Sequence, residues 1–373
     1  MTTFTIQTKR RLPELIRSRI LSLITRSGLR KGDPLPSYRE LCERFKVSLV
    51  TVKRAMDELV KEGLVEVQPA KGVFVGKDLA PQSGKLSQLG VIFYCSRRLV
   101  FSERYLMEIL QGVLLSAEDA GADARLFSVK SDGQIRPEEV ETSGVDGVIL
   151  VGVTNVPLLK SFSVQQTPAV LVDNRELSVN LDCVVVDNYA ATDAIVAHLH
   201  DLGHTSLGYL DGYTTDTALP GDPVVEGSDA FERRDGFWAA LERRGLRSEG
   251  RVFPVSEKDP AASAALAADA WITAERRPTA LVCYSTGYAW NLIHELEQRG
   301  VRVPQDVSVA AVVGAGDDRQ GTRLLTCTRV DFTELGRRAV QVLAERCQSP
   351  RPAREEPSRV PAQLLVGNTT TRS

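Results

Sequence analysis

Hydrogen-bond donors and positive charges gather near the N-terminus of this 373-residue chain. The first 80 residues hold 16 Lys and Arg against 9 Asp and Glu, whereas the remaining residues hold 30 against 39. A basic segment joined to an acidic body is typical of a module that binds a polyanion. Basic and hydroxyl side chains donate hydrogen bonds to the phosphates and base edges of DNA. The candidates for contact with DNA are Arg39, Ser48, Thr51, Lys53 and Lys71, with the apolar Leu49 among them.

The elements predicted around these candidates form a helix-turn-helix. Apolar residues at helical spacing indicate a first helix over residues 12–24. Ser37 and Glu40 have the spacing of a capping box and begin a second helix. Ser48 caps a third helix, which ends near residue 62 before a glycine. The inward-facing stripe predicted for this third helix is Val52, Met56, Leu59 and Val60.

A predicted β-hairpin follows the third helix. Two short apolar segments, 64–67 and 73–75, flank a turn that contains Lys71. Two short helices followed by a hairpin make a winged helix-turn-helix, whose second helix enters the major groove of DNA. The sequence therefore predicts a DNA-binding domain over residues 1–77.

The order and spacing of these segments resemble the GntR family of bacterial regulators. The matching residues are 32–41 (GDPLPSYREL), 47–48 (VS) with 51–55 (TVKRA), and Leu59 with 62–64 (EGL). The resemblance places Ser48, Thr51 and Lys53 in the first turns of the recognition helix. It also places Arg39 near the N-terminus of the preceding helix, where phosphate is attracted, and Lys71 at the tip of the wing.

Leu49 departs from the family pattern, which has an arginine at this position. An arginine there can pair with guanine through two hydrogen bonds, whereas leucine can only contact a thymine methyl group or pack against sugar. The wing departs as well, because Pro69 and Ala70 replace the usual extra glycine and arginine. We therefore expect an operator that differs from the family's usual one at the base that faces residue 49.

Residues 78–88 are polar and contain Pro81 and Gly84, which predicts a linker. Beyond the linker, apolar segments alternate with helical ones to the C-terminus. Strands are predicted at 89–94, 147–151, 169–172, 183–186, 207–210, 280–283 and 307–312, and helices at 103–120, 190–202, 229–244, 261–275, 287–299 and 332–347. This alternation is typical of α/β folds with doubly wound parallel sheets, which bind ligands at the carboxyl ends of their strands.

This body, residues 89–373, resembles the effector-binding and dimerisation domain of LacI-type regulators, which is similar to periplasmic sugar-binding proteins. The best-matching segments are 184–188, 198–208, 236–241, 299–309 and 335–339. The resemblance implies two lobes between which the chain crosses three times. The first lobe would comprise residues 89–188 and 331–357, and the second residues 189–330 and 358–373.

The resemblance also implies a small polar effector, a sugar or a sugar derivative, bound between the lobes. Arg233 matches an arginine that contacts the effector in the family, and its five donors suit a ligand rich in hydroxyl or carboxylate groups. Tyr105 stands where an aromatic residue flanks the site. The other candidates lie at or just after strand ends: Ser96, Asp173, Asp211, Tyr284 and Ser285.

Two further positions depart from the LacI-type pattern. Ser285 and Thr286 replace an Asn-Asp pair, and Val313 stands where an aspartate usually follows the strand at 307–312. The sugars that LacI-type regulators bind therefore cannot be assigned to this chain from the resemblance. Three aromatic residues near the site have two interpretations, stacking on a sugar ring or packing in the core: Tyr284, Tyr288 and Trp290.

The composition narrows the remaining classes of protein. No apolar run reaches the roughly 18 residues of a membrane helix, and the polar N-terminus does not resemble a signal peptide, so we expect a cytoplasmic protein. Six scattered cysteines without a CxxC pair favour free thiols over disulfides or structural zinc. His198, His200 and His204 spread around a helix at their spacing, so neither a metal site nor a cofactor is predicted.

The function predicted by these patterns is a transcriptional repressor controlled by a small ligand and bound as a homodimer to double-stranded operator DNA. Two alternatives remain open. The body could serve only to dimerise the DNA-binding domain, since fold does not fix function. An enzyme fused to a GntR-type domain is disfavoured, because the body is short for an aminotransferase-like fold and contains no phosphate loop, nucleophile elbow or HExxH motif.

Overall fold

The computed structural model describes most of the chain from residue 29 onward and parts of the segment before it. The described residues are 29–45, 47–69, 71–77, 86–95, 97–127, 144–164, 167–212, 227–253, 259–314, 318–348 and 353–373, and also 13, 16, 17, 20, 21, 23, 24 and 140. No helix within these ranges is both long enough and apolar enough to cross a bilayer.

The N-terminal domain is the predicted winged helix-turn-helix. Its elements are α2 (Tyr38–Phe45), α3 (Leu49–Lys61), β1 (Val65–Gln68) and β2 (Gly72–Val75). The two helices and the wing enclose one apolar core, formed chiefly by Ile16, Ile20, Ile24, Leu41, Val52, Ala55, Met56, Leu59, Val65 and Val75. Val60 was predicted to face this core but is exposed. Because successive helical residues are turned by about 100°, Leu59 occupies the core position and directs its neighbour outward.

The wing is an antiparallel pair of strands that is held to the rest of the domain by backbone hydrogen bonds. Val65 pairs with Val75, and the register continues to the turn at Lys71. The backbone amides of Gly32 and Leu35 donate to the carbonyls of Val75 and Val73, each at 2.8 Å. The segment before α2 therefore fixes the position of the wing against the helices.

The first lobe of the body is a six-stranded sheet in the described residues, with all neighbouring strands parallel and in the order β15-β7-β6-β5-β3-β4. Its strands are β3 (Gln88–Phe93), β4 (Asp123–Phe127), β5 (Gly147–Val151), β6 (Ala169–Val172), β7 (Asp182–Val186) and β15 (Ser358–Val360), and its helices are α4 (Arg97–Ser102), α5 (Arg104–Asp119), α7 (Val156–Val164) and α12 (Phe332–Gln348).

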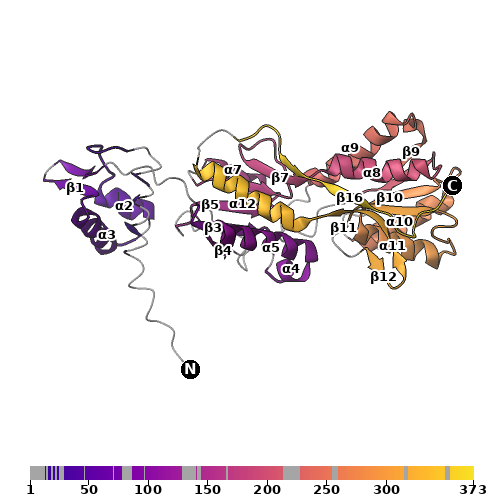
Figure 1. The fold of residues 1–373 in the computed structure, drawn as a ribbon, viewed down its shortest axis with the longest axis horizontal. Helices are drawn as coiled ribbons and strands as arrows, with labels where there is room; N and C mark the ends of the chain where they lie inside the picture. Colours follow the sequence, from indigo (N-terminus) through magenta and orange to yellow (C-terminus); the bar gives the residue numbers. More distant parts are fainter. Residues whose placement is uncertain are drawn as a thin grey trace, which may run out of the picture.

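Helices α5 and α12 lie side by side on this sheet (Figure 1). Glycines allow their close approach: a Cβ atom on Gly112 would overlap the backbone of Thr333, and one on Gly336 would overlap the carbonyl of Ile109. A segment from the far end of the chain is thereby fixed against the beginning of the body.

The second lobe is also six-stranded in the described residues, in the order β16-β14-β11-β10-β8-β9, and only the β14–β16 pair is antiparallel. Its strands are β8 (Leu207–Leu210), β9 (Gly250–Phe253), β10 (Ala280–Ser285), β11 (Ser308–Gly314), β14 (Thr326–Val330) and β16 (Ala362–Leu365). Its helices are α8 (Asn188–Asp201), α9 (Ser228–Arg243), α10 (Pro260–Thr273) and α11 (Thr286–Gln298), with the short 3-10 helix η2 (Arg247–Glu249) and the small hairpin β12 (Arg319–Gln320) and β13 (Arg323–Leu324).

The chain passes between the two sheets at three places in the described residues: from β7 to α8, from β14 to α12, and from β15 to β16. The last passage was predicted near residue 358 and lies instead after Val360. Ser358–Val360 continue the first sheet because they pair in parallel with Val184–Val186 of β7. Only after Pro361 does the chain enter the second sheet.

The predicted linker extends too far toward the body. Leu86 is buried, and the backbone amides of Ser87 and Gln88 donate to the carboxylate of Asp146 at 2.9 and 2.8 Å. These contacts place residues 86–88 in the first lobe. The rest of the predicted linker, residues 78–85, lies outside the described residues.

Candidate functional site

The N-terminus of α3 displays the polar residues predicted to contact DNA. Ser48 is the N-cap, and its hydroxyl accepts a hydrogen bond from the backbone amide of Thr51 at 3.4 Å and lies 2.9 Å from the Thr51 hydroxyl. Lys53 is exposed on the next turn. These three residues share the end of the helix at which backbone N–H groups are free to meet a phosphate.

Leu49 and Val50 are also exposed at this end of α3, at 57% and 67% of their surface. The opposite side of the helix is buried through Val52, Ala55 and Met56. Two adjacent apolar side chains in water are unfavourable unless something covers them, and a thymine methyl group provides such a surface in the major groove. The sequence reasoning selected Leu49 but missed Val50, which periodicity alone does not distinguish from a core residue.

Arg39 and Lys71 lie on either side of the recognition helix in the sequence. Arg39 is exposed on α2, and its Nε atom is 3.3 Å from the carboxylate of Glu43. This exposed ion pair is weak and can exchange for a phosphate. Lys71 is exposed in the turn between β1 and β2.

The start of α2 is fixed by the predicted capping box. The backbone amide of Ser37 donates a hydrogen bond to the carboxylate of Glu40 at 2.7 Å, and this bond lowers the pKa of that carboxyl group.

In the body, Arg233 of α9 lies at the centre of a buried polar cluster. Its Nε atom donates to the side-chain oxygen of Asn188 at 2.8 Å, and Nη1 donates to the carbonyl of Tyr284 at 3.1 Å. Its Nη2 atom is 3.5 Å from the carboxylate of Asp229, and the guanidinium carbon lies 4.4 Å from the centre of the Tyr284 ring. The tyrosine hydroxyl donates in turn to Asp229. Arg233 is therefore bonded to its own chain on several sides.

Asp173 reaches this cluster from the other lobe. It follows β6 directly and has a φ angle of 59°, in the left-handed region that few residues other than glycine, asparagine and aspartate adopt. Burial, and after it the nearby charge of Asp229, raise the pKa of Asp173 to about 7, while Arg233 opposes this change. The two predicted candidates Asp173 and Arg233 are thus brought into one cluster. Asp229 of α9 also belongs to it and was not predicted from the sequence.

The lobes are joined beside this cluster by direct hydrogen bonds. The side-chain oxygen of Asn174 accepts from the Ser228 hydroxyl at 2.9 Å, and the backbone amide of Arg175 donates to the same hydroxyl at 2.9 Å. Arg359 of β15 contacts Glu232 of α9 at 3.1 Å. The N-terminus of α9 is therefore capped by a residue of the first lobe, since its own N-cap is Gly227.

The remaining effector candidates have different surroundings. Asp211 is buried and forms an ion pair with Arg234 at 2.5 Å, and Ser285 is half-buried as the N-cap of α11. Tyr105 packs against Phe332, with ring centres 5.8 Å apart, near the passage from β14 to α12. Ser96 lies outside the described residues.

The three aromatic residues near β10 belong to the core. Tyr284, Tyr288 and Trp290 are all buried in the apolar cluster of the second lobe, and the rings of Tyr284 and Tyr288 meet edge to face with centres 5.6 Å apart. Of the two interpretations of these residues, packing in the core is the one that fits Tyr288 and Trp290. Tyr284 additionally covers Gly212, where a Cβ atom would overlap its ring.

Val313 does not occupy a position after the strand, as the sequence analysis assumed. Strand β11 continues to Gly314, and Val313 is buried within it opposite Ser285. The apolar run AAVV gave no sign of where the strand ends. The first acidic residue described after the strand is Asp318, which is buried and bound by Arg329 at 2.8 and 2.9 Å.

The histidines predicted not to bind metal hold the C-terminal residues. The ring nitrogens of His204 lie 2.8 Å from the Thr279 hydroxyl and 2.9 Å from the carbonyl of Thr371, and His198 lies 3.1 Å from the Thr370 hydroxyl. Within the described residues, no group of three His, Cys, Asp or Glu side chains is placed to hold a metal ion.

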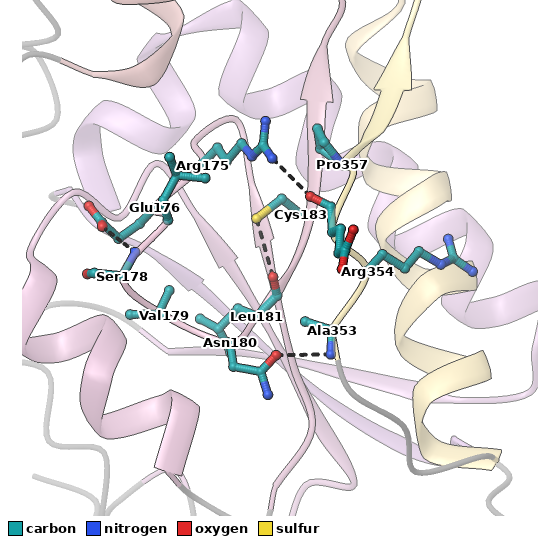
Figure 2. A pocket seen from close by; sticks show the side chains of 12 residues that line it. Arg175, Glu176, Ser178, Val179, Asn180, Leu181, Cys183, Ala353, Arg354 and Pro357 are labelled. Atoms are coloured by element: carbon teal, nitrogen blue, oxygen red, sulfur yellow. Dashed lines mark hydrogen bonds between the residues drawn. The ribbon is translucent and has the colours of Figure 1, made fainter.

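A separate hollow of about 410 Å³ lies on the first lobe, between residues 175–183 and 353–357 (Figure 2). Arg175 spans its edge and donates to the carbonyl of Glu355 at 2.9 Å, and Asn180 accepts from the backbone amide of Ala353 at 3.0 Å. These bonds fix the segment that leads into β15, so the hollow adjoins the interlobe contacts without containing the Arg233 cluster.

The two parts of the chain match two different families. Residues 12–75 match the bacterial regulatory proteins of the gntR family, and residues 196–370 match the periplasmic binding protein-like domain. Over 345 residues the chain is 25% identical to the arabinose metabolism transcriptional repressor of Geobacillus stearothermophilus, covering 88% of this chain and 89% of the repressor. It is 26% identical over 359 residues to the HTH-type transcriptional regulator Rv3575c of Mycobacterium tuberculosis, covering 90% and 98%.

Solved structures show the same fold for the body. A LacI transcriptional regulator from a Rhodococcus species has a TM-score of 0.60 at 23% identity and covers 76% of this chain and 98% of its own. The lac repressor dimer bound to operator and an anti-inducer has a TM-score of 0.59 at 20% identity, covering 78% and 96%. The chain is therefore a transcriptional regulator that joins a DNA-binding domain matching the gntR family of bacterial regulatory proteins to a periplasmic binding protein-like domain.

Proposed function

We propose that this regulator represses transcription as a homodimer and that a small polar metabolite of carbohydrate type, bound where the lobes meet, changes its affinity for the operator. The observation that carries the proposal is the buried cluster of Asp173, Asp229 and Arg233, which is assembled from both lobes. A ligand that contacts both lobes binds more tightly to one relative arrangement of the lobes than to another. Such a difference in affinity is what allows a ligand to shift a conformational equilibrium.

The names of similar proteins support this class of ligand. One relative is a repressor of arabinose metabolism, and two structures of similar fold hold bound sucrose and bound ribose. We assign DNA contact to Arg39, Ser48, Leu49, Thr51, Lys53 and Lys71. We assign the effector site to Asp173, Arg233, Asp211, Tyr284 and Ser285, with Tyr105 and Ser96 at its margin. No catalytic step is part of this function, and it places the protein in the cytoplasm with its DNA.

The proposed dimer uses one face of α5. Met107, Gln111, Leu114 and Glu118 are spaced at successive turns of this helix and are exposed, while its opposite face packs against α12. Met107 and Leu114 expose 40% and 47% of their surface, and Leu115 beside them is exposed as well. We call these residues the α5 face. A self-complementary apolar patch is what a two-fold dimer requires, and two-fold dimers suit two-fold operators.

The proposed domains are residues 1–77 for DNA binding, a linker that ends before Leu86, and the body from there to residue 373.

The experiment is a titration of the full-length protein with arabinose, ribose and other sugars, with and without saturating operator. Coupling between sites is typically about 1–3 kcal/mol, or about 5–150-fold in affinity. Linkage requires that a sugar which weakens operator binding is itself bound more weakly, by the same factor, when operator is present. A sugar that binds with equal affinity in both conditions contradicts control through this site and leaves the body as a dimerisation scaffold.

A further inference from the structure

Among the described residues, the polar cluster between the lobes contains one more carboxylate than cations. Asp211 is paired with Arg234 at 2.5 Å, and Glu232 is paired with Arg359 at 3.1 Å. Asp229 shares the guanidinium of Arg233. Among the described residues this leaves Asp173 without a basic partner. Asp173 is half-buried, and a partly buried carboxylate without a cationic partner is unfavourable, so it takes up a proton or attracts a cation.

The position of Asp173 beside Asp229 is fixed by the backbone. Asn174 and Ser228, the adjacent residues, are hydrogen-bonded at 2.9 Å across the lobes. The φ angle of 59° at Asp173 further fixes the direction in which its side chain leaves the strand. Within the described part of the chain, no hydrogen bond or ion pair is made by its carboxylate. The contact between these neighbouring residues brings Asp173 and Asp229, on opposite lobes, close enough for the charge of Asp229 to act on Asp173.

Arg233 is already engaged and cannot neutralise both carboxylates. Its Nε and Nη1 atoms donate to Asn188 and to the carbonyl of Tyr284, and its flat face covers the tyrosine ring. The side chain is buried, with only 5% of the residue exposed. Turning the guanidinium toward Asp173 would break these bonds in a place that water cannot reach.

A second observation at the same place is the hydroxyl of Tyr209. Tyr209 is 0% exposed, and its hydroxyl has no hydrogen-bond partner among the described residues. Its ring stacks on Phe237, one helical turn after Arg233, with ring centres 5.2 Å apart. Burial, and then the charge of Asp211, raise the pKa of this hydroxyl, and Asp229 and Arg233 also act on it. Asp229 and Arg233 act on both Tyr209 and Asp173, so the hydroxyl belongs to the same polar cluster. A buried hydroxyl without a partner among the described residues indicates that a polar ligand satisfies it.

We propose that the effector carries a protonated nitrogen that binds between Asp173 and Asp229, as an amino sugar or an amino polyol does. This inference rests on the proposed function and narrows its ligand class. A neutral sugar donates hydrogen bonds to a carboxylate but leaves the excess charge in place. An ammonium group offers three donors and neutralises it. The ligand then bridges the lobes, because its charge is held by one residue from each.

The test compares amino sugars with their neutral parents on the full-length protein. Glucosamine, galactosamine and mannosamine are matched against glucose, galactose and mannose, and glucamine against sorbitol, in thermal melts at neutral pH. At least one amine is expected to raise the melting temperature above the effect of its parent. Asp173→Asn removes the charge, retains the size and tolerates the left-handed backbone, so it should abolish this preference. Glu275→Gln removes a charge from an exposed position and should leave the preference unchanged.

The inference is overturned if no amine stabilises the wild type more than its parent, or if Asp173→Asn keeps the preference. Its failure differs from failure of the proposed function. A neutral sugar that binds and shifts operator affinity refutes the charged ligand but supports effector control. An amine that binds only in the presence of Asp173, with no effect on the operator, supports the ligand class and contradicts the coupling.

Discussion

At the scale of single residues, Arg233 organises the polar groups between the lobes. The resemblance to LacI-type domains predicts its presence and its place near the effector. The structure adds that three of its nitrogen atoms face Asn188, Tyr284 and Asp229 of its own chain. In the proposed function, Arg233 therefore positions the acidic residues of the site in addition to contacting the ligand.

Replacing Arg233 by alanine is accordingly expected to cost stability. Asp229 and Asn188 would remain buried without this partner, and breaking a buried ion pair from one side costs about 3–5 kcal/mol. Arg243→Ala is the matched control, because this arginine lies on the same helix, is exposed, and shares Asp193 with Arg244. An exposed pair is worth less than about 1 kcal/mol. Thermal or urea unfolding measures both variants, and equal losses would contradict the buried role of Arg233.

Asp173 is expected to make stability depend on pH. Its pKa is raised to about 7 in the folded chain, whereas an unfolded aspartate titrates near about 4. The folded state thus binds this proton more tightly than the unfolded state does. The resulting contribution of Asp173 to the free energy of unfolding is fully present below about pH 4 and is lost as the pH rises through about 7. The groups acting on Asp173 are the carboxylate of Asp229 and the guanidinium of Arg233.

The measurement is the melting temperature of wild type and of Asp173→Asn across this pH range. Wild type should lose stability relative to the variant as the pH increases from about 4 to 7. A difference between the two proteins that does not change with pH would show that Asp173 titrates normally.

Lys53 is expected to contribute directly to operator binding. It is exposed two turns from the buried Leu59 and one turn from the Ser48 cap, at the end of α3 that enters the groove. Lys53→Ala should weaken binding by about 1–3 kcal/mol if it contacts a base or a phosphate. Lys61→Ala removes the same charge from the other end of the same helix and should have a smaller effect. Equal effects in a fluorescence-anisotropy titration would mean that general charge, rather than the position of Lys53, governs affinity.

At the scale of elements, most helices and strands could be predicted because their apolar periodicity is strong. The capping box at Ser37 and the N-cap at Ser48 formed as the local sequence required. The end of β11 was misplaced because Ala310–Val313 is apolar and gives no sign of a boundary. Ser358–Val360 escaped prediction because it is a three-residue strand whose pairing with β7 depends on residues far away in the sequence.

Disrupting the α5 face is expected to dissociate the proposed dimer. Leu114→Glu would place a charge in the middle of this apolar patch, where an unpaired carboxylate opposes burial. Leu266→Glu on α10 is a suitable control, since Leu266 exposes 46% of its surface and Leu114 exposes 47%. Sedimentation velocity should show monomers for Leu114→Glu and dimers for wild type and the control. Dimers of Leu114→Glu as stable as wild type would place the interface elsewhere.

At the scale of the whole molecule, the chain divides into a DNA-binding domain and a body of a different fold, to which the proposed function assigns recognition of a ligand. The capped helices and wing of the first 77 residues, and the alternation of strands and helices after them, predicted this division. The meeting of Asp173 with Asp229 could not be predicted in this way. The two residues are far apart in the sequence and on different lobes, and they become neighbours through contacts between the lobes such as that of Asn174 with Ser228.

The most direct test of the central claim is selection of binding sites from a random DNA library by the full-length protein. A dimer with one recognition helix in each subunit should enrich an inverted repeat, with half-sites about one helical turn apart or a multiple of it. Lys53→Ala should weaken binding to the selected sequence more than Lys61→Ala does. Enrichment of no sequence, or of one without inverted symmetry, would contradict the proposal that this chain is a dimeric regulator that reads a specific operator.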